Sequence, residues 1–283
     1  MIEIKRKAAT LAEALPYITR WRNAVFVIKV GGSLLDEPRN RQVMLEDVAL
    51  LSRVGIRPVL VHGGGKLASR MMKDAQLEPR FIDGLRVTDE PTLKVIKQAF
   101  SKTNAELVQG LRDVGGQAIP LAAVRTSVIM AQPLRPELGF VGQVESVALD
   151  VLGALIKDAQ VPVISPLGLG PDGQIYNINA DEVAQAVAVQ LGAEKLTLLT
   201  DVEGVLVDGE LISHLDVGDI EELIVRGKIT EGMIPKVRAA EEAVRAGVRK
   251  VHFIDGNIEH ALLLEIFTHE GVGTEVGDEK REQ

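Results

Sequence analysis

The sequence contains no cysteine among its 283 residues. Disulfides, thiolate zinc sites and cysteine nucleophiles are therefore excluded. Its five histidines are scattered, without the short spacing of metal ligands, so we predict no metal site. No apolar stretch is long enough to span a bilayer, and the N-terminal residues lack the pattern of a signal peptide. We therefore expect a cytoplasmic protein with no membrane partner.

Aromatic residues are also scarce, at 3% of the chain. The core must therefore be built from aliphatic side chains, which suits a parallel sheet covered by helices. Basic residues are outnumbered, and the net charge is −8. This acidic balance argues against a nucleic-acid partner. Any anionic ligand must be bound by local cations and backbone dipoles.

The most informative stretch is Val25–Ser33, in which an apolar, β-rich run carries Lys29 into Gly31 and Gly32. Its length and composition predict a buried strand. A buried ammonium group requires an anion, and glycines let backbone N–H groups approach that anion closely. The stretch therefore predicts a phosphate site. An edge lysine that reaches solvent beside an ordinary turn is the alternative.

Pro58–Lys66 repeats this theme, because an apolar run again ends in glycines, Gly63 to Gly65, before a predicted helix. Two such units in succession indicate a βαβ arrangement, whose loops meet at one edge of the sheet. The spacing fits neither the G-x-x-x-x-G-K-[ST] loop nor the G-x-G-x-x-G pattern. The motif thus predicts close backbone approach without naming a ligand.

Strands alternate with helices along the whole chain, which predicts an α/β fold with a mainly parallel sheet. Asn177, Asn179 and Asp181 alternate, so in an extended segment they share one face. That face is a candidate site, although an N-cap for the following helix is the simpler interpretation. Gly271–Val276 is expected to pair as an edge strand.

The N-terminal segment has a capping-box pattern at Thr10–Glu13, followed by an apolar stripe at helical spacing. The stripe comprises Leu11, Leu15, Ile18 and Trp21. Because this helix precedes the first core strand, its stripe suggests contact with another subunit. Packing on its own lobe is the alternative.

Six segments together, in this order, resemble the amino acid kinase family, and within it the enzymes that phosphorylate N-acetyl-L-glutamate. They are Lys29–Gly32, His62–Gly65, Gly84–Thr88, Asn177–Asp181, Leu199–Val205 and Gly232–Lys236. The resemblance covers residues 24 to 276. It implies a three-layer αβα fold with two lobes that follow an inter-subunit helix over residues 1–23. The N-terminal lobe, residues 24–175, would bind the acceptor and form the dimer. The C-terminal lobe, residues 176–283, would bind ATP and arginine.

The resemblance also implies ATP and Mg²⁺ as cofactors and a role for each matched residue. The catalytic residues would be Lys29, Lys236, Asp181, Gly31 and Gly32. The acceptor would be bound by Gly63, Gly64, Arg86, Asn177 and Asn179. The nucleotide would be bound by Thr200, Asp201, Val202, Gly204, Val205 and Lys236.

His260–Thr274 is similar to the C-terminal signature of the arginine-inhibited enzymes of this group, which also carry an extra N-terminal helix. This resemblance implies feedback inhibition by L-arginine and a homohexamer built as a trimer of dimers. The implied arginine contacts are Tyr17, Lys195, His252, Glu265 and Gly271. A PII-type regulatory protein is a further partner that the resemblance leaves open.

Ala122–Thr126 stands where the family often has a Gly-Lys-Asp-Gly-type segment, while the proposed catalytic residues are intact. Two alternatives remain open. One is another carboxylate or carbamate kinase of the same family, against which the Arg86 segment argues. The other is a non-catalytic arginine sensor, against which both lysines and Asp181 argue.

Overall fold

The computed structural model describes residues 2–122, 128–229, 232–268 and 271–279. The segment 122–126 therefore lies almost wholly outside the described residues. The helices are α1 (Ile2–Trp21), α2 (Ser33–Asp36), α3 (Pro38–Arg53), α4 (Gly65–Asp74), α5 (Glu90–Asp113), α6 (Leu149–Lys157), α7 (Ala180–Leu191), α8 (Ile220–Val225), α9 (Ile234–Arg245) and α10 (Ala261–Phe267), with a 3-10 turn, η1, at Pro136–Leu138. Within the described ranges, none of these helices is both long and apolar enough to cross a membrane.

The central sheet has eight strands in the order β14-β16-β15-β11-β1-β2-β8-β5. These are β14 (His214–Asp216), β16 (Thr274–Gly277), β15 (Lys250–Asp255), β11 (Lys195–Thr200), β1 (Val25–Val30), β2 (Arg57–His62), β8 (Val161–Ile164) and β5 (Ala118–Leu121). All neighbours pair in parallel except β15 and β16. The predicted mainly parallel α/β sheet is thus confirmed.

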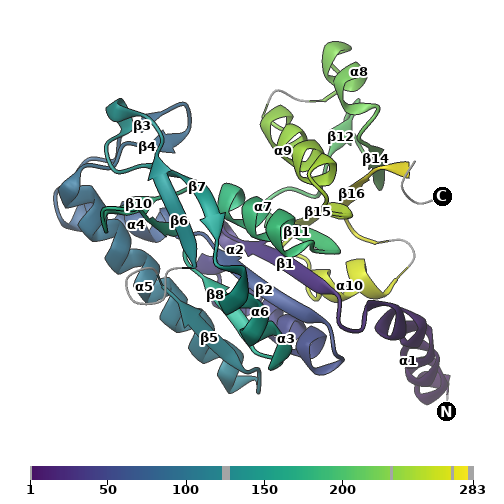
Figure 1. Cartoon of the computed structure of the whole chain (residues 1–283). Coiled ribbons are helices and arrows are strands. Elements are labelled where there is room, and N and C mark those ends of the chain that lie inside the picture. Colours follow the sequence, from purple (N-terminus) through teal and green to yellow (C-terminus); the bar gives the residue numbers. More distant parts are fainter. Residues whose placement is uncertain (1, 123–127, 230–231, 269–270, 280–283) are drawn as a thin grey trace.

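Alternate residues of β1 serve two separate cores. Phe26 and Ile28 belong to the cluster under α3, α5 and α10, whereas Val27 belongs to the cluster under α6, α7 and α9. Helices therefore cover both faces of the sheet, which gives three layers (Figure 1). Since side chains alternate along a strand, Lys29 leaves β1 on the same side as Val27, toward α7.

The strand order reverses at β1, because β2, β8 and β5 continue to one side while β11 and β15 continue to the other. In open α/β sheets, ligands bind beyond the carboxyl ends of the strands at such a reversal. Lys29 stands near the end of β1, and Asp201 directly follows β11. The fold thus brings together two segments that are far apart in the sequence.

A smaller sheet with the order β10-β9-β6-β7 lies beside the central one. Its strands are β6 (Ile129–Pro133), β7 (Gly142–Val147), β9 (Leu167–Leu169) and β10 (Ile175–Asn177), and two hairpins, β3 (Phe81–Ile82) with β4 (Leu85–Arg86) and β12 (Leu206–Val207) with β13 (Glu210–Leu211), complete the fold. Helix α1 stands at a corner of the molecule beside α10 (Figure 1).

The predicted edge strand at 271–276 is wrong in its position. β16 pairs with β14 on one side and antiparallel with β15 on the other, so β14 is the edge. The chain reverses before β16, and hydrophobic periodicity carries no information about strand direction or order. The predicted stripe of α1 is divided: Trp21 is buried in this chain, whereas Leu15 is exposed.

Phe26 anchors the core beneath α3 and offers a stability test. Its side chain is fully buried, and its ring meets the Trp21 ring edge-on with centroids 5.7 Å apart. We expect Phe26→Ala to lower the free energy of unfolding by about 3–5 kcal/mol, through lost burial and a cavity. Urea unfolding measures this, with Val225→Ala, whose side chain is exposed, as a control expected to change stability by less than about 0.5 kcal/mol. Equal effects of the two substitutions would contradict the assigned core.

Candidate active site

The centre of the site is an ion pair between β1 and α7. Lys29 Nζ lies 2.9 Å from Asp181 Oδ1, and the lysine side chain is largely buried. The alternation predicted that Asp181 lies in an extended segment. In the structure Asp181 instead lies in the first turn of α7. Asn179 is the N-cap, and its side chain accepts the Asp181 N–H at 2.9 Å. This cap starts the helix and thereby aims the carboxylate at Lys29.

Three glycines of the two loops stand where a side chain would crowd its neighbours. A Cβ on Gly31 would stand 3.1 Å from Lys29 Nζ, and one on Gly32, whose φ is +66°, would stand 2.6 Å from an Asp201 oxygen. A Cβ on Gly64 would approach the Phe100 ring to 2.7 Å. A larger residue at these positions would displace those side chains, and glycine lets a backbone N–H group approach an anion closely.

A cavity of about 400 Å³, here called the lysine cavity, opens at the ends of β1 and β11. Its lining includes the predicted residues Lys29, Gly31, Gly32, Asn179, Asp181, Thr200, Asp201, Val202 and Lys236. Lys236 comes from the first turn of α9. Two predicted contacts lie elsewhere: Val205 is fully buried and donates its N–H to Thr274 Oγ1, and Gly204 packs against the same threonine.

Asp201 connects the two ends of this cavity through a partner that sequence analysis missed. Its Oδ1 accepts the Ser33 hydroxyl at 2.6 Å and the Ser33 N–H at 3.1 Å. The Ser33 hydroxyl bond is the main reason why the pKa of Asp201 is lowered. The carboxylate is therefore ionised at neutral pH and tethers the loop after β11 to the loop after β1.

A second cavity of about 210 Å³, the Arg86 cavity, is lined by the second glycine loop, Gly63 to Gly65. All five predicted acceptor-binding residues line it: Gly63, Gly64, Arg86, Asn177 and Asn179. The Arg86 guanidinium donates to Ser69 Oγ at 2.8 Å and to the Gly65 carbonyl at 3.1 Å, and it stacks on the Phe81 ring. These contacts fix a fork-shaped cation on the cavity wall. Asn179 borders both cavities.

A buried network that the sequence analysis did not identify supports the second glycine loop. His62 Nδ1 lies 2.6 Å from the Gly63 carbonyl, and its Nε2 lies 2.9 Å from Ser165 Oγ. Asn104 Nδ2 donates to the Val163 carbonyl and lies 3.2 Å from both His62 Nε2 and Ser165 Oγ. No spacing rule could have linked Asn104 and Ser165 to His62, because they come from α5 and from the loop after β8.

The burial of His62 predicts a pH dependence of stability. Burial lowers the pKa of His62 from its ordinary 6.5 to about 4. As pH falls below 6.5, His62 becomes protonated in the unfolded chain but stays neutral in the folded chain until about pH 4. The free energy of unfolding therefore decreases between about pH 6.5 and 4. The loss is at most about 3 kcal/mol. Urea unfolding across this range tests it: His62→Gln is less stable throughout but loses less on acidification, and parallel curves would contradict the assignment.

A third cavity of about 320 Å³, the Trp21 cavity, lies between α1, α10 and β16. Tyr17, Lys195, Glu265 and Gly271 line it, and the buried His252 contacts two of these residues, Lys195 and Glu265. His252 Nδ1 lies 2.7 Å from Glu265 and its Nε2 lies 2.8 Å from Lys195 Nζ. Burial lowers the pKa of Lys195 to about 8. The structure thus brings all five predicted arginine contacts together.

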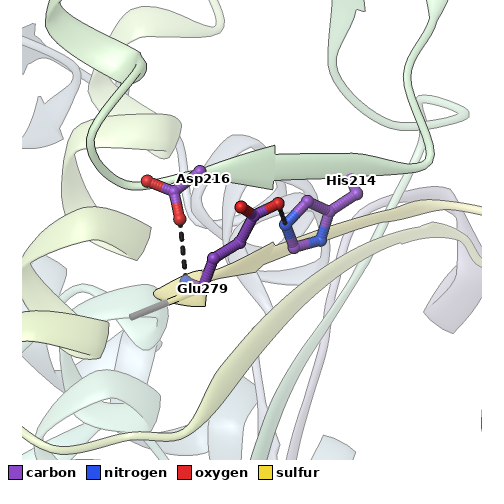
Figure 2. A group of neighbouring side chains, drawn as sticks. All are labelled: His214, Asp216 and Glu279. Carbon is purple, nitrogen blue, oxygen red and sulfur yellow. Dashed lines mark hydrogen bonds and ion pairs between the residues drawn. The ribbon is translucent and has the colours of Figure 1, made fainter. Parts of the chain in front are cut away.

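His214, which borders the Trp21 cavity, forms a group with Asp216 and Glu279 at the edge strand β14 (Figure 2). Their candidate ligand atoms all lie within 4.8 Å of one another. The three residues contact one another: Glu279 lies 3.5 Å from His214 Nε2, and the Asp216 carboxylate accepts the Glu279 backbone N–H at 2.8 Å. The group is partly exposed and is accounted for by these contacts.

Glycine loops at two neighbouring strand ends, with a lysine–aspartate pair lining a cavity beside them, are a constellation suited to phosphoryl transfer. The sequence model described as the amino acid kinase family matches residues 24–255, more than half of the chain. The chain belongs to the amino acid kinase family and is thus a kinase.

Within this family, the chain is similar over nearly its full length to enzymes with one named activity. The acetylglutamate kinase of Desulforamulus reducens is 42% identical, and the match covers 98% of this chain and 99% of that protein. The acetylglutamate kinase of Halothermothrix orenii is 44% identical, over 99% of this chain and 100% of that protein. The likeness thus extends to nearly the full length of both.

Among solved structures, N-acetylglutamate synthase from Neisseria gonorrhoeae complexed with coenzyme A and N-acetyl-glutamate has a TM-score of 0.86 at 27% identity. The match covers 96% of this chain and 63% of the synthase chain, so the synthase is considerably longer. A second structure of that synthase, complexed with coenzyme A and L-arginine, has a TM-score of 0.81.

Proposed function

We propose that this kinase transfers the γ-phosphoryl group of ATP to the γ-carboxylate of N-acetyl-L-glutamate, producing N-acetyl-L-glutamyl 5-phosphate for arginine biosynthesis. The observation that carries the proposal is the Lys29–Asp181 pair beside Asn179, the residue that the lysine cavity and the Arg86 cavity share. The two relatives named above, both acetylglutamate kinases, support this choice of substrate.

The reaction needs no general base. A γ-carboxylate has a reference pKa near ~4.3 and is already ionised at neutral pH. One carboxylate oxygen forms a bond to the γ-phosphorus, the bond from that phosphorus to the β,γ-bridging oxygen breaks, and the electron pair leaves with ADP. No proton has to move. Catalysis then consists of positioning and charge neutralisation.

Each residue of the site has a role in that scheme. Lys29 and Lys236 supply cations to the phosphoryl group in flight, and the N–H groups of the glycine loops donate to its oxygens. Asp181 orients Lys29 and accepts no proton. In the Arg86 cavity, the Arg86 fork binds the α-carboxylate of the acceptor, and Asn177 fixes the rest of that molecule.

Mg²⁺ fits the donor set beside the nucleotide. The carboxylates of Asp181 and Asp201 both border the lysine cavity, and oxygen ligands combined with phosphate oxygens suit this ion. When bound with ATP, the ion would neutralise part of the phosphate charge. The two carboxylates would hold it directly or through water.

Hydroxylamine trapping tests the proposed activity, because it converts an acyl phosphate into a stable hydroxamate. We expect ATP-dependent hydroxamate with N-acetyl-L-glutamate, and little with L-glutamate, L-aspartate or carbamate at the same concentration. A preference for one of those acceptors would indicate another kinase of the family and overturn the assigned substrate.

We further propose that the Trp21 cavity binds L-arginine as a feedback inhibitor. The lining combines acids, Glu265 and Glu275, for a guanidinium group with cations, Lys195 and Arg20, for a carboxylate. Trp21 Nε1 is a buried donor without a hydrogen-bond partner in the described structure, and a ligand oxygen would satisfy it. Hydroxamate formation should fall when arginine is added. Saturable arginine binding without turnover would instead indicate a sensor.

We also propose that α1 joins subunits into a hexamer, a trimer of dimers. One support is the place of α1 at a corner of the molecule (Figure 1). Another is the side chain of Leu15, which is 60% exposed. Size-exclusion chromatography with light scattering tests this: we expect a hexamer for the full chain and a dimer for Leu15→Glu. A full chain that is dimeric would exclude the role of α1.

A further inference from the structure

Lys66 directly follows the second glycine loop and is the second residue of α4. It borders a cavity of about 160 Å³ together with Gly32, Gly64 and Gly65. Gly32 also borders the lysine cavity, and Gly64 also borders the Arg86 cavity. Lys66 therefore approaches the proposed reaction centre from α4, whereas Lys29 and Lys236 approach it from β1 and α9.

The start of α4 resembles that of α9, because each has a lysine and no acidic residue in its first turn, and both differ from the starts of α5 and α7. A helix N-terminus is positive and normally attracts acidic residues. Helix α5 begins with Glu90 behind an Asp89 cap, and α7 begins with Asp181 behind an Asn179 cap. Helix α4 has neither an acidic first turn nor a side-chain cap, and instead adds the cation Lys66. The positive end of the helix dipole and the Lys66 ammonium group together favour an anion bound at the N-terminus of α4.

Within the described residues, the carboxylate of Asp201 is the nearest anionic group to Lys66. Lys66 Nζ lies 3.9 Å from Asp201 Oδ2, which is too long for a hydrogen bond. Asp201 is held independently by Ser33. About half of the Lys66 side chain is exposed, and its unbranched stem can turn. Lys66 can therefore leave Asp201 at little cost.

The charge of the reaction also calls for a further cation. The carboxylate acceptor and the γ-phosphoryl group are both anionic when they meet. Asp181 neutralises one of the two charges of Lys29 and Lys236, and Mg²⁺ bound with ATP would offset only part of the phosphate charge. We propose that Lys66 is a third catalytic lysine, which turns from its position near Asp201 to contact the γ-phosphoryl oxygens beside Gly32 and Gly64. This rests on the proposed kinase function.

Two substitutions of Lys66 and one matched control test the proposal. Lys66→Met removes the charge, Lys66→Arg keeps it, and Lys73→Met removes an exposed charge at the opposite end of the same helix. A charge-assisted contact is worth roughly 10- to 100-fold. We therefore expect Lys66→Met to lower kcat/KM for ATP by about that factor, Lys66→Arg to restore part of it, and Lys73→Met to match the wild type.

Binding measurements identify the phosphate that is contacted. Calorimetry with AMP-PNP and with ADP should show the non-hydrolysable ATP analogue bound about tenfold more weakly by Lys66→Met, and ADP bound within twofold of the wild type. Equal weakening of both nucleotides would mean that Lys66 acts on the nucleotide through Asp201, and would overturn the proposal. So would unchanged kinetics and binding.

These measurements also separate this proposal from the proposed substrate. If the wild type forms no hydroxamate with N-acetyl-L-glutamate, the substrate assignment fails, but the AMP-PNP and ADP comparison needs no acceptor and still tests Lys66. If the wild type is active and Lys66→Met is within twofold of it in every assay, the Lys66 proposal alone fails.

Discussion

Lys29→Met is expected to lower kcat by about 10³-fold, because it removes a preorganised cation aimed at charge that develops during phosphoryl transfer. The remaining carboxylate of Asp181 is partly exposed, so water can solvate it and the fold should persist. The measurement is the initial rate of hydroxamate formation, together with thermal unfolding.

The matched control for this prediction is Lys157→Met, which removes an exposed lysine from the last turn of α6. It should leave kcat unchanged. If Lys29→Met retained a tenth or more of the wild-type kcat, the ion pair between β1 and α7 would be structural and the reaction centre would lie elsewhere.

Arg86→Leu is expected to weaken binding of the acceptor and not to slow the phosphoryl transfer step itself. Losing a fork that binds a carboxylate in a half-buried position should raise KM for N-acetyl-L-glutamate by about 10²-fold, while KM for ATP stays within about twofold. Arg86→Lys should recover only part of the loss, because an ammonium group is a point charge without the fork.

The control for Arg86 is Arg80→Leu, an exposed arginine just before the β3–β4 hairpin. It should leave both KM values unchanged. Equal increases in KM for ATP and for the acceptor in Arg86→Leu would mean that the guanidinium supports the glycine loop through Gly65, and would remove it from acceptor binding.

The strands carrying the glycine loops could be predicted from the sequence because their signal is local. A short apolar run that ends in glycines specifies a buried strand and its carboxyl end without reference to any partner. The parallel pairing of β1, β2 and β11 then follows from the alternation with helices. This is why Lys29, Gly32 and Gly64 could be assigned to one edge of the sheet, whereas Asp201 was implied only by the family resemblance.

Other features depend on contacts between distant residues, which no local pattern encodes. Ser33 and Asp201 are joined across 168 positions, and the loop after β8 supplies Ser165 to His62. The alternation of Asn177, Asn179 and Asp181 suggested an extended face, but the cap formed by Asn179 turns the chain into α7 first. The lobe boundary, the hexamer and a PII-type partner stay predictions.

The most direct test of the proposed function is ³¹P NMR of the purified chain with ATP, Mg²⁺ and N-acetyl-L-glutamate. The proposed reaction predicts equal amounts of ADP and of one acyl phosphate, both dependent on the acceptor. ADP that appears with inorganic phosphate and never with an acyl phosphate, or no consumption of ATP, would contradict it.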